Sequence, residues 1–192
     1  ALMGWVDWLK NHPNKIKDII PEMEVDLQRL EQIGRRFSKM GSRSDFEELD
    51  LSERIEKIVT YLTKRLPSIG KKVELVNDIQ PGVFITANGS LLAWSIENII
   101  RNGIDAIERD NGKISVSLKK DIEGINIRIE DNGRGIPKKD WKNIFRPGFS
   151  TKQTGWGLGL SLSSRIVEEI HGGSLKVIRS SANTGTILEI SL

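Results

Sequence analysis

The chain has 192 residues, of which 38% are hydrophobic and 29% are charged. A disordered chain would have fewer apolar residues and a larger charge imbalance, so this composition predicts a soluble globular protein. The 29 basic and 26 acidic residues are interspersed and leave a net charge of only +3, which argues against nucleic acid as a partner. The absence of cysteine excludes disulfides, thiolate metal sites and a cysteine nucleophile, and agrees with a reducing compartment.

No apolar run approaches the ~20 residues of a membrane-spanning helix, and no signal-peptide pattern opens the chain. We expect this chain to be cytoplasmic and to make no contact with a membrane. This expectation holds even if the longer parent protein is anchored in a membrane. The opening stretch ALMGWVDWLK is already helical in its periodicity with no cap before it, which indicates a fragment of a longer protein.

Residues 1–44 are predicted to form a helical hairpin that breaks at NHPNK. Its second helix carries an apolar seam with coiled-coil-like spacing, made of Met23, Leu27, Leu30, Ile33, Phe37 and Met40. A lone hairpin buries such a seam poorly, so we expect two copies to pair into a four-helix bundle. The stretch GSRSD then breaks the pattern before a second domain at 45–192.

The second domain has the pattern of a mixed α/β fold. Helices are expected over 50–66, with Asp50 or Ser52 as cap, and over 89–108, 138–145 and 159–173. Strands are expected over 73–79, 113–121, 124–131, 174–180 and 185–192. Helices placed among mostly antiparallel strand pairs predict an α+β fold, a two-layer α/β sandwich in which helices cover one face of a mixed sheet.

The helix over 89–108 has a polar face on which Asn98, Asn102 and Asp105 lie together by their spacing. The opposite side carries isoleucines that should pack on the sheet, namely Ile96, Ile100, Ile104 and Ile107. An Asn carboxamide offers an oxygen to a metal and a donor to phosphate, which suits Mg²⁺ held together with substrate phosphates. A solvated helix face is the alternative.

The stretch IEDNGRGIP, residues 129–137, places an acid before two glycines. Asp131 ends a predicted strand, so we expect an exposed carboxylate, held rigidly at a sheet edge, that accepts a hydrogen bond from an exocyclic amine such as that of adenine. Gly133 and Gly135 would let the backbone approach a flat ligand. A plain turn with glycines at positive φ is the alternative.

Downstream, Gly155, Gly157 and Gly159 lead into a helix start, where free N–H groups and the helix dipole favour phosphate. Thr151 and Lys152 add a hydroxyl and a charge. The stretch is neither a Walker A loop nor a Rossmann fingerprint, and a flexible lid whose glycines serve only motion is the alternative.

The two histidines, His12 in the break of the hairpin and His171 before a pair of glycines, are expected to serve in turns or caps and not in catalysis.

In this order, the segments resemble the nucleotide-binding signature of the GHKL superfamily, specifically that of sensor histidine kinases of two-component systems. ENIIRNGIDAI is similar to the N box, DNGRGIP to the first glycine box, and IFRPGFSTK to the F box. GWGLGLSLSSRIVEEIHGG with the closing TGTILEISL is similar to the second glycine box and final hairpin. The resemblance covers 46–192 and implies the Bergerat ATP-binding fold with ATP and Mg²⁺ as cofactors.

The resemblance also implies roles. Asn102 would ligate Mg²⁺, Asn98 would contact the phosphates or the metal shell, and Asp131 would accept from the adenine amine. The other implied contacts are Gly133, Gly135 and Ile136 at the base, Thr186 near the amine, Phe145 and Phe149 at the lid hinge, and Thr151, Lys152, Gly155, Gly157, Leu158 and Gly159 in the lid. Asp105 stands where many members have lysine, so the phosphate contacts are expected to rest on Lys152 and Arg101.

The hairpin resembles the dimerisation and histidine-phosphotransfer bundle of the same family, whose acceptor motif, of the type H-E-[LF]-x-x-P-[LI], does not occur in this sequence. The resemblance implies a protein-histidine kinase that forms a homodimer and passes the phosphoryl group to a response regulator receiver domain. We expect ATP binding by this chain without autophosphorylation.

Two alternatives remain open. One is a related ATPase clamp or serine kinase, although Asn98 stands where such clamps place a glutamate base, and Glu97 points about 100° away around the helix. The other is a dimeric nucleotide-binding scaffold without phosphotransfer.

Overall fold

The computed structural model describes residues 46–69, 72–108, 110–152 and 157–192, together with 16, 17, 19–21 and 24. The chain divides into two compact units, Ala1–Ser44 and Asp45–Leu192. The described residues of the first unit are helical. The seam of the predicted hairpin and His12 lie outside the described residues, so the hairpin and its pairing stay predictions.

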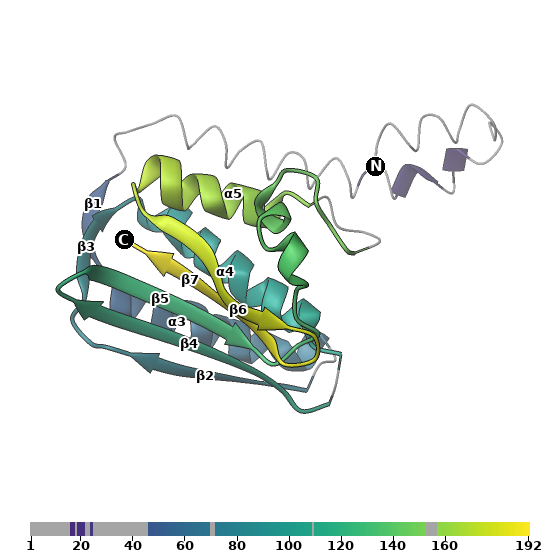
Figure 1. Cartoon of the computed structure of the whole chain (residues 1–192), viewed down its shortest axis with the longest axis horizontal. Coiled ribbons are helices and arrows are strands. Elements are labelled where there is room, and N and C mark those ends of the chain that lie inside the picture. Colours follow the sequence, from purple (N-terminus) through teal and green to yellow (C-terminus); the bar gives the residue numbers. More distant parts are fainter. Residues whose placement is uncertain are drawn as a thin grey trace. The chain divides into compact units, whose positions relative to one another are not determined.

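The second unit combines strands and helices (Figure 1). Its strands are β1 (Glu47–Asp50), β2 (Val73–Ile79), β3 (Phe84–Ala87), β4 (Gly112–Asp121), β5 (Gly124–Asp131), β6 (Ser174–Ser181) and β7 (Gly185–Ser191). Its helices are α3 (Leu51–Arg65), α4 (Gly89–Ala106) and α5 (Gly159–Arg165).

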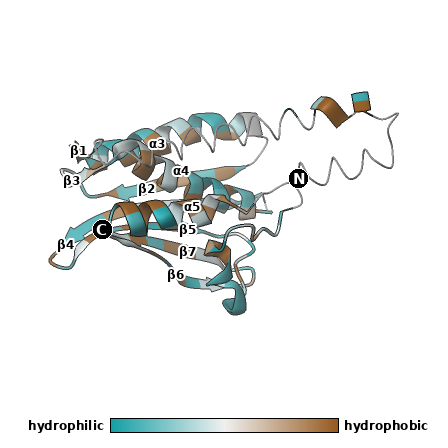
Figure 2. Cartoon of the chain, turned by 90° about the horizontal axis from the view of Figure 1, so that it is seen from above, coloured by the Kyte–Doolittle hydropathy of each residue, from teal (hydrophilic) through white to brown (hydrophobic). Residues whose placement is uncertain are grey.

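The strands form a five-stranded sheet in the order β2-β4-β5-β7-β6 and a separate ribbon of β1 and β3. Strand β2 is parallel to β4, and the other neighbours in the large sheet are antiparallel. The helices α3, α4 and α5 lie on one side of this sheet (Figures 1 and 2). The predicted two-layer sandwich with a mixed sheet is confirmed.

The core forms between the sheet and the helices because both present apolar faces to each other. On β4, Ile114, Val116 and Leu118 are buried and alternate with more exposed residues, as a half-covered strand requires. The predicted isoleucine face of α4 is confirmed, since all of its members are buried in the core: Ile96, Ile100, Ile104 and Ile107.

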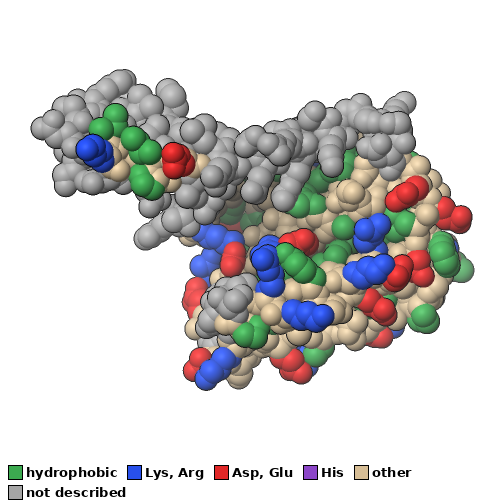
Figure 3. Space-filling model, turned by 180° about the vertical axis from the view of Figure 1, so that it is seen from behind, with side chains coloured by type: hydrophobic (Ala, Val, Ile, Leu, Met, Phe, Trp, Pro, Cys, Tyr) green, Lys and Arg blue, Asp and Glu red, His purple; other side chains and the backbone are tan. Residues whose placement is uncertain are grey.

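The open face of the sheet is polar. Ion pairs link its strands there: Arg128 of β5 pairs with Glu189 of the neighbouring β7, and Arg179 of β6 pairs across β7 with Glu130 of β5. Acidic and basic side chains are also interspersed on the face opposite to that of Figure 1 (Figure 3). Among the residues that the structure describes, no helix is both long and apolar enough to cross a membrane.

Of the two caps expected for α3, Asp50 is confirmed, since it accepts from the Glu53 N–H at 3.1 Å, whereas the Ser52 hydroxyl donates to the Gln80 carbonyl at 2.8 Å. The ribbon of β1 and β3 was not predicted, because four-residue strands are too short to show an alternating pattern.

Two predicted helices are shorter or broken. The segment 138–145 forms 3-10 turns at Lys138–Asp140 and Asn143–Phe145, since so short a segment nucleates a helix poorly. Helix α5 ends early and continues as a π-helical turn at Ile166–Ile170.

Candidate functional site

Asp131 lies at the end of the central strand β5, between β4 and β7. Its carboxylate is buried, with only 8% of the residue exposed, which corrects the expectation of an exposed group at a sheet edge. Burial raises the pKa of Asp131 to about 6 from the usual 3.8, although N–H groups of Gly133 and Thr186 donate to the carboxylate and partly offset this shift. A buried carboxylate that stays ionised at pH 7 is a strong acceptor for a donor that enters the site.

The loop after Asp131 is tied to its surroundings at both glycines. The Gly133 N–H donates to Asp131 Oδ1 at 2.8 Å, and a Cβ atom at Gly133 would lie 2.6 Å from the Ala106 carbonyl oxygen. Gly135 has a φ of +76°, which other residues rarely adopt. The loop is therefore held between the end of α4 and the β6–β7 turn, with little room for side chains.

Predicted contacts to a purine base gather around Asp131. Thr186 pairs with Asp131 across β5 and β7, and its hydroxyl lies 2.9 Å from the Ser180 hydroxyl. The Ser180 hydroxyl in turn accepts from the Ile136 N–H at 2.7 Å. Ser180, which no sequence pattern singles out, thus joins the loop to the final hairpin.

Helix α4 approaches Asp131 at Gly103, the residue after Asn102. A Cβ atom at Gly103 would lie 3.3 Å from Asp131 Cβ, so the residue after Asn102 touches the buried acid directly. On the solvent side, the Lys152 ammonium donates to Asn102 Oδ1 at 3.2 Å and to Asp105 Oδ2 at 2.6 Å. The predicted metal ligand thus follows on from the helix residue that lies against the buried acid and is hydrogen-bonded to the predicted lid lysine.

Asn98, one turn earlier on α4, contacts the start of α5. Its Nδ2 donates to the Ser163 hydroxyl at 3.0 Å. Arg101, the other cation expected at the phosphates, forms an ion pair with Glu97 at 2.8 Å. Leu158 is the N-cap residue of α5 and Gly159 its first residue.

The predicted hinge residues Phe145 and Phe149 are partly buried and pack against the core, as does Ile136. The Gly148 N–H donates to the Gly157 carbonyl at 3.1 Å, and Gly157 has a φ of +65°. This hydrogen bond joins the two ends of the segment that runs from Gly148 to Gly157.

Thr151 adjoins the loop that follows Asp131. The Arg134 guanidinium donates to the Thr151 hydroxyl at 2.7 Å and approaches Glu108 at 3.3 Å. Gly155 lies outside the described residues, so its place in the lid stays a prediction.

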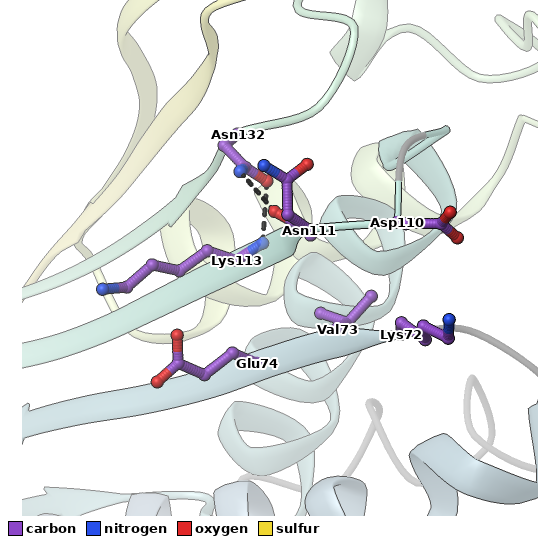
Figure 4. A pocket seen from close by; sticks show the side chains of 8 residues that line it. Lys72, Val73, Glu74, Asp110, Asn111, Lys113 and Asn132 are labelled. Carbon is purple, nitrogen blue, oxygen red and sulfur yellow. Dashed lines mark hydrogen bonds between the residues drawn. The ribbon is translucent and has the colours of Figure 1, made fainter.

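Asn132, the residue after Asp131, is hydrogen-bonded to the start of β4. Its Oδ1 accepts from the Lys113 N–H at 2.7 Å and its Nδ2 donates to the Asn111 carbonyl at 3.0 Å, as Figure 4 shows at the rim of a shallow hollow between β2 and β4. These bonds tie the end of β5 to the start of β4 and so hold the backbone next to Asp131.

Known proteins are similar to this chain in sequence and in fold. Residues 88–192 match the family model of histidine kinase-, DNA gyrase B- and HSP90-like ATPases. Sporulation kinase C of Bacillus subtilis (strain 168) is 32% identical over 194 aligned residues, which cover 100% of this chain and 45% of that protein. The chain thus spans about half the length of this relative.

Solved structures agree in fold. The mycobacterial sensor histidine kinase MprB is 25% identical with a TM-score of 0.66, over 77% of this chain and 96% of that one. Histidine kinase ThkA, solved in complex with the response regulator protein TrrA, is 21% identical with a TM-score of 0.70, over 98% of this chain and 55% of its own. The latter likeness concerns the fold alone.

The chain belongs to the histidine kinase-, DNA gyrase B- and HSP90-like ATPase family. Within this family it is a catalytic ATPase domain homologous to two-component sensor histidine kinases. Membership of the family implies ATP as the ligand.

Proposed function

We propose that this chain is the ATP-binding kinase core of a sensor histidine kinase. In the intact protein, the γ-phosphoryl group of Mg·ATP would pass to a histidine nitrogen and then to an aspartate of a response regulator. The observation that carries this proposal is the buried carboxylate of Asp131, which lies against Gly103, the residue after Asn102 on α4.

Asp131 would recognise adenine through the exocyclic amine. The carboxylate has few water partners at 8% exposure, so a hydrogen bond from the amine would restore solvation that folding removed. Thr186, Ile136, Gly133 and Gly135 would line the same pocket, since the hydrogen bonds of Ser180 and the loop bring them together.

Asn102 would hold Mg²⁺ through its amide oxygen. Among the described residues, no group of three His, Cys, Asp or Glu side chains could form a metal site by itself. Such a setting fits a magnesium ion that takes most of its ligands from water and from the triphosphate. When bound, the ion would neutralise charge on the transferred phosphoryl group.

The residues around the phosphates would act by positioning. Lys152 and the start of α5 at Leu158 and Gly159 would face the triphosphate, with Asn98 holding α5 in place. Phe145 and Phe149 would anchor the lid that carries Thr151, Lys152, Gly155 and Gly157.

The acidic side chains favour phosphotransfer over an ATPase clamp. A clamp needs a carboxylate to activate water, but Asn98 occupies the expected position and Glu97 is paired with Arg101 at 2.8 Å. An imidazole nitrogen, by contrast, attacks with its own lone pair and needs no such base. The receiver partner is supported by ThkA, which was solved with a response regulator, and homodimerisation would use the predicted hairpin.

Calorimetry with ATP and Mg²⁺ tests the site. Asn102→Ala and Asp131→Ala should each abolish measurable binding, whereas Asn126→Ala, on the open face of the sheet, should bind as the wild type does. Unchanged affinity in both site variants would refute the assignment. A separate histidine-bearing bundle added with labelled ATP then tests transfer, and binding without any transfer would favour the scaffold alternative.

A further inference from the structure

Asp105 is an acid on the helix face that the proposed function turns toward a triphosphate. It lies three residues after Asn102, so both side chains project from the same side of α4. An unpaired carboxylate at this place would repel the phosphates and weaken binding. A solvated helix face alone therefore does not account for an acid at this position.

The ammonium of Lys152 pairs with the Asp105 carboxylate. Its ammonium is 2.6 Å from Asp105 Oδ2 and 3.2 Å from Asn102 Oδ1. The lysine comes from the segment between Gly148 and Gly157, whereas both acceptors belong to one regular helix. A cation from a loop is thus held at a defined point on a rigid element, directly beside the proposed magnesium ligand.

We propose that Asp105 is a positioning residue that holds Lys152 at the phosphate site. The inference rests on the proposed function. A free lysine side chain has several rotatable bonds, and ordering it opposes binding. Since Asp105 restrains the ammonium before the nucleotide arrives, less ordering remains to be done on binding.

A magnesium ion held by Asn102 Oδ1 would repel the Lys152 ammonium that donates to the same oxygen. With Mg·ATP in the site, Lys152 would turn from Asn102 to a phosphate oxygen, while Asp105 would keep its hydrogen bond to the ammonium. The charge of Asp105 stays neutralised throughout, so the acid does not repel the triphosphate.

The pair is exposed, at 38% for the lysine side chain and 49% for the aspartate. Ion pairs this exposed contribute little to folding stability. Loss of Asp105 should therefore be visible in phosphate binding, and hardly at all in the unfolding transition.

A double-mutant cycle tests this inference. Asp105→Asn should weaken Mg·ATP binding by about three- to tenfold, a coupling of the size expected for residues in contact, and should leave adenosine binding unchanged. In a Lys152→Met background, Asp105→Asn should no longer weaken ATP binding, because there is no lysine left to position. Asp105→Glu, which keeps the carboxylate, should retain most of the affinity.

The matched control is Glu53→Gln, which breaks an exposed ion pair with Lys57 of the same 2.6 Å length on α3; it should change neither ligand's affinity. If the wild type binds ATP but Asp105→Asn binds it equally well or more tightly, the positioning role is wrong while the proposed function stands. If the wild type does not bind ATP, the proposed function itself fails.

Discussion

Gly159, the first residue of α5, lies directly against the side chain of Asn98 on α4. A Cβ atom at Gly159 would be 2.6 Å from Asn98 Oδ1 and 3.1 Å from Nδ2. The same amide donates to Ser163, one turn further along α5. The Asn98 side chain therefore contacts the helix start that we assign to phosphate binding and is hydrogen-bonded one turn further along the same helix.

We expect Gly159→Ala to destabilise the fold by about 1 kcal/mol, because the Asn98 amide must move away from the new Cβ atom and lose its hydrogen bond to Ser163. In an Asn98→Ala background the colliding atoms are gone, so the same change should cost far less or even stabilise. Urea unfolding of the four proteins measures both effects. Additive effects of the two changes would show that the contact does not exist.

Burial of Asp131 predicts a conflict between stability and binding. Its pKa is raised from 3.8 to about 6, and each unit corresponds to about 1.36 kcal/mol. Asp131→Asn should therefore raise the unfolding free energy at pH 7 by up to about 3 kcal/mol while it abolishes nucleotide binding. Asp78→Asn, at an exposed ion pair with Lys119, serves as the control and should not stabilise the fold.

The sign of this effect can be checked with pH. Between pH 3.8 and about 6 the folded protein binds more protons at Asp131 than the unfolded one does, so this group's contribution to stability falls as the pH rises through that window. The gain in unfolding free energy from Asp131→Asn should reach its full size above pH 6 and vanish below pH 4. An advantage that persists at pH 4 would contradict the assigned pKa.

The same titration should appear in binding by the wild type. If the ionised carboxylate accepts the adenine amine, protonation competes with binding, and the affinity should fall toward tenfold per pH unit below about 6. Adenosine is the suitable ligand because it has no phosphates that titrate in this range. An affinity that stays constant from pH 5 to 8 would argue against Asp131 as the acceptor.

The regular elements could be predicted because their patterns are local. Strands β2 and β5 have the predicted bounds, and the isoleucine face of α4 is buried as its spacing indicates. The burial of Asp131 could not be predicted in this way. It depends on Gly103, whose missing side chain lets α4 approach the end of β5, and a strand pattern carries no information about that approach.

The supporting contacts of the site escaped prediction for a related reason. Ser163 and Ser180 act through hydrogen bonds to Asn98 and Ile136, which are distant in sequence. Isolated serines have no spacing that marks such a partner. The pairing of Asp105 with Lys152 likewise joins residues from separate segments, although the charge of Asp105 on the polar face of α4 was a visible signal.

His171 should not accept a phosphoryl group, because both of its ring nitrogens are engaged. Nδ1 lies 2.7 Å from the Ile166 carbonyl, to which it donates, and Nε2 accepts from the Asn88 N–H at 3.1 Å. The Nε2 lone pair is thus taken by a hydrogen bond and the Nδ1 proton points at a carbonyl, so neither nitrogen is free to attack a phosphoryl group. This agrees with the expected role at the end of a helix.

Incubation of this chain with labelled ATP should therefore give no stable phosphohistidine at His171, and we expect none at His12, as measured by acid-labile, base-stable label and by peptide mass spectrometry. The added histidine-bearing bundle is the positive control, since label on it would show that the kinase is competent under the same conditions. His171→Ala should lower the unfolding free energy by about 1–3 kcal/mol, because the Asn88 N–H and the Ile166 carbonyl would lose a partner. Label on His171 would mean that these bonds open readily, and would overturn its structural role.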